Sequence, residues 1–402
     1  MSKIKIKNFG PIKDTDGWLD ITKVTVFIGN QGSGKSTVAK LISIFTKIEK
    51  SLVRGDFKKE WFEEQKKLEN YFLPYHRLEN YLCPNSIIDY QGDAYSINYK
   101  DETLSIKEVP NKTYSLPQIM YVPAERNFLS YIKGATELKL SSESLQDFNT
   151  VYFKAKQELK DVLRLPINDA DIEYNELNDN LYLKGRNYKI KITEASSGFL
   201  SFVPLYLVSN YLANSIKVQS ENKEPMSSDE NLRFRKGLRE IWNNNYLSDG
   251  QKREAISELA SAFNKTSFVN IVEEPEQNLF PTSQWQMLQS LVEFNNMNEG
   301  NRLIMTTHSP YLISYLTLLV KSGELKSKIK TDVLKQELEE IVSLNSTINS
   351  GDLSIYELDE ITGTIHTLET YNGLPSDENT LNEKLDEGNE LFAQLLEIQQ
   401  KL

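Results

Sequence analysis

The first fifty residues combine two hydrophobic patterns that are typical of different secondary structures. Lysine and isoleucine alternate over residues 3–7, and this period of two predicts a half-exposed strand. Residues 24–28 (VTVFI) are almost entirely apolar or β-branched and predict a buried strand. A glycine-rich turn follows, and then apolar residues at Val38, Leu41 and Ile42, whose spacing predicts a helix. We therefore expect a strand–turn–helix unit here.

The middle of the chain mixes both patterns. Residues 50–82 are charged and rich in aromatic side chains, and they are predicted to be helical, as are residues 135–165. Alternation over residues 95–99 predicts antiparallel strands, and residues 117–123 predict a short core strand. Residues 171–193 predict hairpin strands.

The later part of the chain alternates strands with helices. Apolar runs at residues 268–272 and 303–306 predict strands, and a helix through Trp285, Leu288 and Val292 lies between them. This order favours a largely parallel sheet with helical crossovers.

Two other segments of this part stand outside that alternation. Residues 217–235 are polar, contain a proline and have almost no aliphatic side chains, which predicts a linker. The tail predicts a hairpin over residues 353–367 and then an amphipathic helix through Leu381, Leu385, Phe392 and Leu395. This helix either docks a partner or packs on its own core.

Composition narrows the class of protein. Of 402 residues, 39% are hydrophobic and 26% charged, which is typical of a globular chain. Cys83 is the only cysteine, which excludes an intrachain disulfide and a cysteine zinc cluster and favours a reducing compartment. The start lacks a signal-peptide pattern, and no apolar run approaches the roughly 18 residues of a membrane span. We expect a soluble, cytoplasmic protein without a membrane partner.

Charge bears on nucleic-acid binding. The net charge of −11 argues against nonspecific binding by the surface as a whole, but leaves a local basic patch open. The candidate patch is Lys321, Lys326, Lys328, Lys330 and Lys335. A solvated helical face is the favoured explanation of these lysines.

The strongest chemical signal is GNQGSGKS at residues 29–36, between a predicted strand and a predicted helix. It matches the P-loop pattern in the context that this motif requires. Its glycines allow backbone N–H groups to point at phosphate oxygens. Lys35 would contact the β- and γ-phosphates, and the Ser36 hydroxyl would ligate Mg²⁺. The alternative is a glycine-rich turn with an incidental lysine.

A second signal is the sequence EEPE at residues 273–276, directly after a predicted buried strand. Glu273 would lie beside the Mg²⁺ ion, and Glu274 would polarise the water that attacks the γ-phosphate. Aspartate is the usual residue at the first of these positions. Because the glutamate side chain is longer, Glu273 is expected to contact the metal either directly or through water. The alternative is a strand that ends in an acidic surface loop.

A third signal is THSP at residues 307–310, after another predicted strand. His308 is one of only three histidines, and it would contact the γ-phosphate or orient the water. By itself such a histidine is more often structural. The order of the three motifs favours the functional interpretation.

Together the motifs at 29–37, 273–276 and 307–310 resemble those of ATP-binding-cassette (ABC) ATPases of the SMC/RecF type, in particular the OLD family and its small relatives. The stretch from Ile6 to Ile12 (IKNFGPI) also resembles that group. The resemblance implies an α/β P-loop NTPase of ABC type, with a mostly parallel core sheet, helices on both faces, an antiparallel β subdomain and a helical lobe. It implies hydrolysis of ATP with Mg²⁺.

The resemblance also implies a composite site. In such ATPases a signature segment begins a helix, and two heads pack head-to-tail so that each signature closes over the other's γ-phosphate. Ser196-Ser197-Gly198 is the only candidate, and Leu200 departs from the usual polar residue. The alternative is a plain helix N-cap. The nucleotide contacts so implied are Gly29, Asn30, Gln31, Gly32, Ser33, Gly34, Lys35, Ser36 and Thr37, together with Ser196, Ser197 and Gly198.

The domain organisation follows from the motifs. We expect one ATPase domain, with a possible Q-loop at residues 121–126 in which Glu125 or Arg126 replaces glutamine; the alternative there is a surface turn with an ion pair. The expected parts are a P-loop core (1–50), a β and helical insertion (51–195), a signature helix with a helical insertion (196–267), a second core segment (268–322) and a C-terminal hairpin and helix (323–402).

The segments between and after the motifs indicate which partners to expect. The interval between the P-loop and the signature lacks sustained heptads, which argues against long coiled-coil arms. The residues after His308 lack the D-x-D pair of a Toprim nuclease. The chain then resembles the stand-alone ATPase subunits of anti-phage systems, which control a separate nuclease or toxin. The open alternatives are a RecF-like ATPase that binds DNA and a slowly hydrolysing, ATP-gated scaffold.

Overall fold

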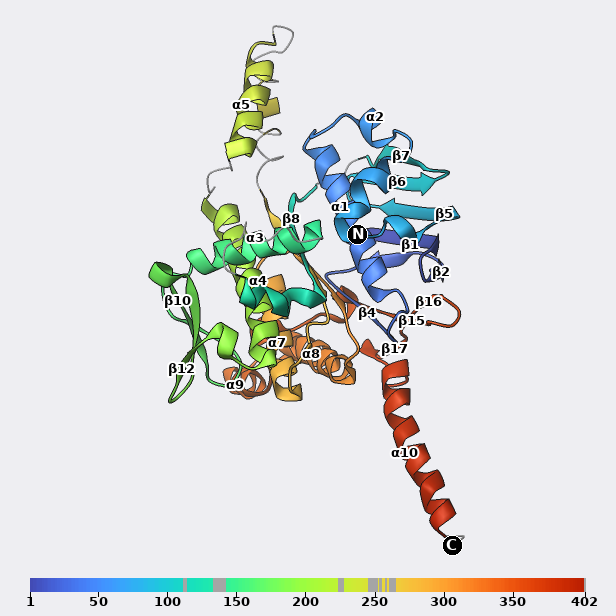
Figure 1. The fold of residues 1–402 in the computed structure, drawn as a ribbon, viewed down its shortest axis with the longest axis vertical. Helices are drawn as coiled ribbons and strands as arrows, with labels where there is room; N and C mark the ends of the chain where they lie inside the picture. Colours follow the sequence, from blue (N-terminus) through green and yellow to red (C-terminus); the bar gives the residue numbers. More distant parts are fainter. Residues whose placement is uncertain are drawn as a thin grey trace.

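The computed structural model shows a mixed α/β body from which one long C-terminal helix extends (Figure 1). The residues that it describes are 1–110, 114–132, 142–222, 228–244, 252, 255, 256, 259 and 265–400.

A six-stranded sheet forms the centre of the protein. Its strand order is β16-β15-β4-β14-β13-β8, and every neighbouring pair is parallel except β15 with β16. The strands are β4 (Val24–Gly29), β8 (Pro117–Val122), β13 (Ser267–Glu273), β14 (Arg302–Thr306), β15 (Leu353–Leu358) and β16 (Ile365–Thr367). The mostly parallel core sheet is therefore confirmed.

Hydrophobic clusters cover both faces of this sheet. Val24, Val26 and Ile28 face a cluster formed with four helices, whereas Phe27 faces another formed with one helix and the second sheet. The four helices are α3 (Glu143–Gln157), α4 (Ser197–Asn222), α7 (Pro281–Asn296) and α8 (Pro310–Lys328), and α1 (Lys35–Val53) covers the other face. Because strand side chains alternate in direction, an almost continuous apolar strand such as β4 supplies both clusters.

The antiparallel subdomain is also present. One sheet has the order β2-β1-β5-β6-β7, with β3 paired to β1. Its strands are β1 (Ser2–Phe9), β2 (Ile12–Asp14), β3 (Leu19–Ile21), β5 (Leu82–Gln91), β6 (Tyr95–Lys100) and β7 (Thr103–Glu108). A four-stranded antiparallel sheet contains β9 (Leu163–Arg164), β10 (Asp171–Asn175), β11 (Asn180–Lys184) and β12 (Lys189–Lys191).

The expected boundaries need correction, because strands pair without regard to sequence order. Residues 1–50 supply β1 to the antiparallel sheet as well as β4 to the core. The core strand β8 comes from the expected insertion at 51–195, and the core strand β15 comes from the expected tail at 323–402.

Two predicted helical regions are shorter than expected. Residues 50–82 contain only the end of α1 and short helical segments, which are α2 (Lys59–Phe62), η1 (Leu68–Phe72), η2 (Pro74–His76) and η3 (Glu79–Tyr81). Within 135–165 the helix α3 (Glu143–Gln157) gives way to β9, and residues 133–141 lie outside the described residues.

The predicted linker at 217–235 is wrong. Helix α4 continues to Asn222, and α5 (Ser228–Trp242) begins soon after residues 223–227, which lie outside the described residues. The expectation that no apolar run approaches the length of a membrane span is also corrected by helix α4. Ser197–Val218 in α4 has a mean hydropathy of 1.2 and is long and apolar enough to cross a membrane. Because 72% of this segment is buried inside the protein, it is a core helix.

The end of the chain contains short elements and then one exposed helix. The short elements are α9 (Asp332–Ile341), η7 (Leu344–Ser346), η8 (Ser350–Asp352), β17 (Thr370–Tyr371) and β18 (Leu374–Pro375). Helix α10 (Thr380–Gln399) has no buried residue and extends away from the body (Figure 1). Its first turn packs on the core through the half-buried Leu381, whereas residues 383–399 are exposed, so the expected packing on its own core applies to that turn alone.

Candidate nucleotide-binding site

Three loops meet at the carboxyl edge of the core sheet. The P-loop follows β4, THSP follows β14 and EEPE follows β13, and these three strands are parallel neighbours. Main-chain hydrogen bonds join the loops: Thr307 N donates to Phe27 O at 3.0 Å, and Glu274 N donates to Thr306 O at 2.9 Å. A crevice at the carboxyl ends of parallel strands is the usual ligand position in such sheets.

The P-loop glycines are required by the backbone. Gly29, Gly32 and Gly34 have φ values of 140°, 80° and 104°, in the region that L side chains rarely adopt. A Cβ atom on Gly29 would also lie 2.4 Å from the carbonyl oxygen of Leu358 in β15. Gly34 is the N-cap of α1, so the loop leads directly into a helix N-terminus that favours anions.

Lys35 lies inside the loop. Its side chain is buried, and its Nζ donates to Gly29 O at 2.8 Å and to Asn30 O at 2.7 Å. Burial lowers the pKa of Lys35 to about 8, although Glu274 and Glu276 act in the opposite direction. The ammonium group is therefore held within the loop, and it loses its proton at a lower pH than an exposed lysine does.

Two further hydroxyl and amide groups line this loop. The Ser33 Oγ is fully buried and has no hydrogen-bond partner in the described structure. The Asn30 side chain donates to Glu360 Oε1 at 2.9 Å, from the turn that follows β15. The Ser36 side chain, where we expect a metal contact, is half-buried at the start of α1.

Glu273 ends β13 with a buried carboxylate. Its Oε2 accepts a hydrogen bond from Ala124 N at 3.2 Å, and its Oε1 is buried without a partner in the described structure. An orphaned buried carboxylate oxygen fits a Mg²⁺ site, since that ion takes one or two protein oxygens plus phosphates and water. Among the described residues no cluster of three or more His, Cys, Asp or Glu could hold a metal.

Glu274 and His308 face each other. The distance between Glu274 Oε1 and His308 Nε2 is 3.5 Å, and both side chains are partly exposed. The contact with His308 lowers the pKa of Glu274, and the charges of Arg126 and Lys35 act in the same direction. Glu274 is thus ionised at neutral pH, as a general base requires. Its backbone has φ 43°, which is uncommon for a residue other than glycine.

Glu276 has a role that the sequence interpretation missed. Its Oε1 accepts hydrogen bonds from Thr307 Oγ1 and from His308 N, both at 2.7 Å. Burial raises the pKa of Glu276, whereas these hydrogen bonds lower it. The last acidic residue of EEPE therefore holds the loop that carries His308. Its position within the motif is the sequence feature that could have indicated this role.

The segment expected to be a Q-loop divides between two environments. Glu125 is exposed, and its Oε1 lies 3.5 Å from Nη2 of Arg77, as the ion-pair alternative predicts. Arg126 is fully buried, and its guanidinium donates to carbonyl oxygens of Glu273 and Glu274 at 2.7 and 2.6 Å. The surface-turn alternative is therefore wrong for Arg126.

The expected signature residues lie apart from the P-loop. Ser196 and Ser197 are exposed and Gly198 is half-buried at the start of α4, where Leu200 N donates to Ser196 O at 3.1 Å. Within the described residues, no hydrogen bond joins Ser196, Ser197 or Gly198 to residues 29–37, and neither serine side chain caps the helix. Leu200 is buried, which explains the apolar side chain at this position.

The candidate basic patch is largely neutralised. Glu324 carboxylate oxygens lie 2.7 Å from Lys321 Nζ and 2.6 Å from Lys328 Nζ. Lys335 pairs with Asp332 at 3.2 Å, and Lys326 Nζ donates to Leu344 O at 2.6 Å. These contacts favour the solvated-face interpretation.

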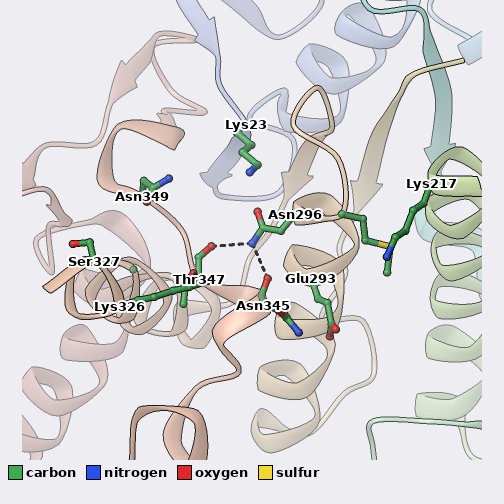
Figure 2. Close-up of a pocket in the computed structure, with 11 residues that line it drawn as sticks. Lys23, Lys217, Glu293, Asn296, Lys326, Ser327, Asn345, Thr347 and Asn349 are labelled. Carbon is green, nitrogen blue, oxygen red and sulfur yellow. Dashed lines mark hydrogen bonds between the residues drawn. The ribbon is translucent and has the colours of Figure 1, made fainter. Parts of the chain in front are cut away.

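A polar cavity of about 750 Å³ lies at the other end of the sheet. Figure 2 shows Lys23, Asn296 and Thr347 on its wall, with Asn296 bonded to the Thr347 carbonyl. Lys23 directly precedes β4, whereas the P-loop follows that strand. The cavity is therefore separate from the three loops.

Comparisons with known proteins give one family match and several distant structural likenesses. No curated protein matches the sequence. Solved structures with a similar fold include the SMC head domain from Thermotoga maritima, with 11% identity, coverage of 92% of this chain and 98% of that chain, and a TM-score of 0.35. An SMC head with an extended coiled coil from Pyrococcus furiosus has 10% identity, coverage of 98% and 100%, and a TM-score of 0.36. The recombination mediator RecF has 13% identity, coverage of 91% and 97%, and a TM-score of 0.31.

These structural likenesses assign a role to no residue of this chain, because the identities and TM-scores are low. The fold is mixed α/β, with the parallel core sheet and antiparallel subdomain described above and the GNQGSGKS loop between β4 and α1. A family model, the AAA ATPase domain, matches residues 1–229, which include the P-loop. Since this match covers more than half of the sequence, the chain belongs to the AAA ATPase domain family.

Proposed function

We propose that this chain hydrolyses ATP at the carboxyl edge of the core sheet and uses the ATP-bound state to control a separate protein. The observation that carries the proposal is the convergence of Lys35, Glu274 and His308 at the carboxyl edge of three parallel strands. Side chains gathered at that edge can bind a triphosphate, neutralise its charge and activate a water molecule.

Each residue at this edge of the core sheet has a proposed role. Backbone N–H groups of residues 29–37 and the N-terminus of α1 bind the phosphates, and Lys35 contacts the β- and γ-phosphates. Mg²⁺, when bound, would supply charge neutralisation at the phosphates, and Ser36 and Glu273 would hold it. Glu274 accepts a proton from the attacking water, and His308 contacts the γ-phosphate and orients that water.

We further propose that two copies pack head-to-tail around two ATP molecules. The exposure of Ser196 and Ser197 supports this, because a helix start whose serine hydroxyls have no hydrogen-bond partner among the described residues is suited to bind phosphate. Each copy would then complete the other's site with Ser196, Ser197 and Gly198.

Helix α10 is the proposed contact for a partner protein. Its Leu385, Leu391, Phe392 and Leu395 side chains are all more than half exposed, which is unusual for large apolar residues. A nuclease or toxin under the control of the ATP-bound dimer, as in anti-phage defence, is the kind of partner proposed. The single cysteine fits a cytoplasmic location.

A turnover assay tests this function. We expect Mg²⁺-dependent release of phosphate from ATP, and ATP-dependent dimers by light scattering. Turnover that DNA strongly stimulates would favour the RecF-like alternative. Tight ATP binding with almost no turnover would favour an ATP-gated scaffold.

A further inference from the structure

Arg126 joins three segments of the chain through its guanidinium group. Nε donates to Ser201 O in the first turns of α4 at 3.0 Å, and Nη1 donates to Pro123 O at 3.1 Å. Nη1 also donates to Glu273 O at 2.7 Å, and Nη2 donates to Glu274 O at 2.6 Å. The side chain is 0% exposed, so none of these bonds competes with bulk water.

Within the described part of the chain, every hydrogen bond of this arginine side chain goes to a main-chain carbonyl. Buried arginines are usually paired with carboxylates, and an unpaired buried charge is costly. The guanidinium plane holds its donors in fixed directions, so its acceptors are fixed relative to one another. Arg126 is therefore suited to set the position of α4 relative to the end of β13.

The two carbonyls flank the backbone of the proposed base. Glu274 adopts φ 43°, and the peptide carbonyls of Glu273 and Glu274 lie on either side of that residue's backbone. Hydrogen bonds at both carbonyls hold this sparsely populated conformation. The carboxylate that faces His308 thus depends on Arg126 for its direction.

A second contact joins the same two segments. Asn278 Nδ2 donates to Ser201 Oγ at 2.9 Å. A Cβ atom on Gly198 would lie 3.0 Å from Asn278 O, so the absence of a side chain allows the helix start to approach this loop. Ser201 therefore accepts hydrogen bonds from both Arg126 and Asn278.

We propose that Arg126 is a positioning residue that couples the signature end of α4 to the backbone of Glu274. Contact of Ser196–Gly198 with the ATP of a second copy would then set the direction of Glu274 in the same chain. This inference rests on the proposed head-to-tail dimer and adds a route between its two sites.

The test is Arg126→Lys, which keeps the charge but loses the planar group. We expect ATP affinity within about threefold of wild type, and kcat lower by about 100-fold, because small misplacements of catalytic groups have effects of that size. In a Glu274→Gln background, Arg126→Lys should cause no further loss of turnover, since residues that act as a unit are not additive. It should still weaken the ATP-dependent dimer about tenfold in that background, as expected for a coupled site.

Controls separate positioning from folding. Arg77→Ala breaks the surface pair with Glu125, next to Arg126, and should change neither kcat nor dimer affinity. If Arg126→Lys does not fold, Ser201→Ala removes only the Asn278 bond to the side chain and should shift both readouts in the same direction by less.

Several results would overturn the inference. Unchanged kcat and dimer affinity in a folded Arg126→Lys, or in Ser201→Ala if the first does not fold, would do so. So would equal losses of ATP affinity and kcat that follow a lower melting temperature. A wild-type chain that hydrolyses ATP but never dimerises overturns the proposed dimer and this inference with it. Normal wild-type behaviour beside unaffected variants overturns the inference alone.

Discussion

The two halves of the expected ATP site differ in how far one chain completes them. The P-loop half is held together by a lysine bonded to loop carbonyls, by Glu276 bonded to the THSP loop and by main-chain bonds between strands. The signature half consists of exposed serines at a helix start. The first half is therefore expected to bind ATP in a single chain, whereas the second is expected to act only between chains.

The largest effect is expected from a substitution in the P-loop half of the site. Lys35→Ala should weaken ATP binding on the order of 100-fold, because a charged hydrogen bond contributes about 1.5–3 kcal/mol. Calorimetric titration with ATP measures the change. Lys328→Ala, at an exposed lysine paired with Glu324, is the matched control and should bind ATP normally. Wild-type affinity in Lys35→Ala would mean that the nucleotide binds elsewhere.

A second change separates chemistry from binding within the complete half. Glu274→Gln should lower ATP turnover by about 100-fold or more, since general bases contribute about that much, while ATP affinity is retained. The ATP-bound dimer should then accumulate. Phosphate release and light scattering measure the two effects, and Glu125→Gln at the exposed neighbour of Arg126 is the control. Unchanged turnover would remove Glu274 from the role of base.

A third change acts on the other half alone. Ser197→Trp should leave ATP binding by the single chain unchanged and should weaken ATP-dependent dimers about tenfold or more, because a bulky side chain blocks a close phosphate contact. Leu177→Trp, at an exposed turn of the four-stranded sheet, is the control. If Ser197→Trp still dimerises with ATP, the two serines are only the start of a helix.

The smallest expected effect is a dependence of ATP affinity on pH. The pKa of Lys35 in the free protein is lowered to about 8 by burial, and phosphate contact requires the protonated form. ATP affinity should therefore be constant below about pH 7 and fall as pH rises through 8, by up to about tenfold per unit, because one proton is taken up. Lys35→Arg should bind more weakly but without this dependence. A flat wild-type profile to pH 9 would contradict the lowered pKa.

Local pattern was sufficient for the elements that carry chemistry. The strand at residues 24–28, the glycine turn and the helix after it were predicted because strand and helix periods are visible within ten residues. The strands before EEPE and THSP were predicted for the same reason. The polar segment at 217–235 failed as a linker because charged, aliphatic-poor sequences also form exposed helices such as α5.

Long-range pairing could not be predicted in this way. The tail hairpin contributes β15 to the core sheet beside β4, where Leu358 O restricts Gly29 to glycine. Arg126 was expected on a surface turn or in a Q-loop, but its four carbonyl acceptors lie up to 148 positions away from it in the sequence. No pattern of neighbouring residues indicates such a contact.

The sequence by itself determined the three motifs, their order and the parallel strands that bring them to one edge, because glycine turns and hydrophobic periods are local properties. Only the tertiary structure decided that Glu276 holds the THSP loop, that Arg126 joins α4 to Glu274, and that Ser196 and Ser197 lie exposed. These depend on which buried polar groups find partners once strands from distant parts of the chain have paired. Burial and hydrogen bonding at that scale follow from the complete fold.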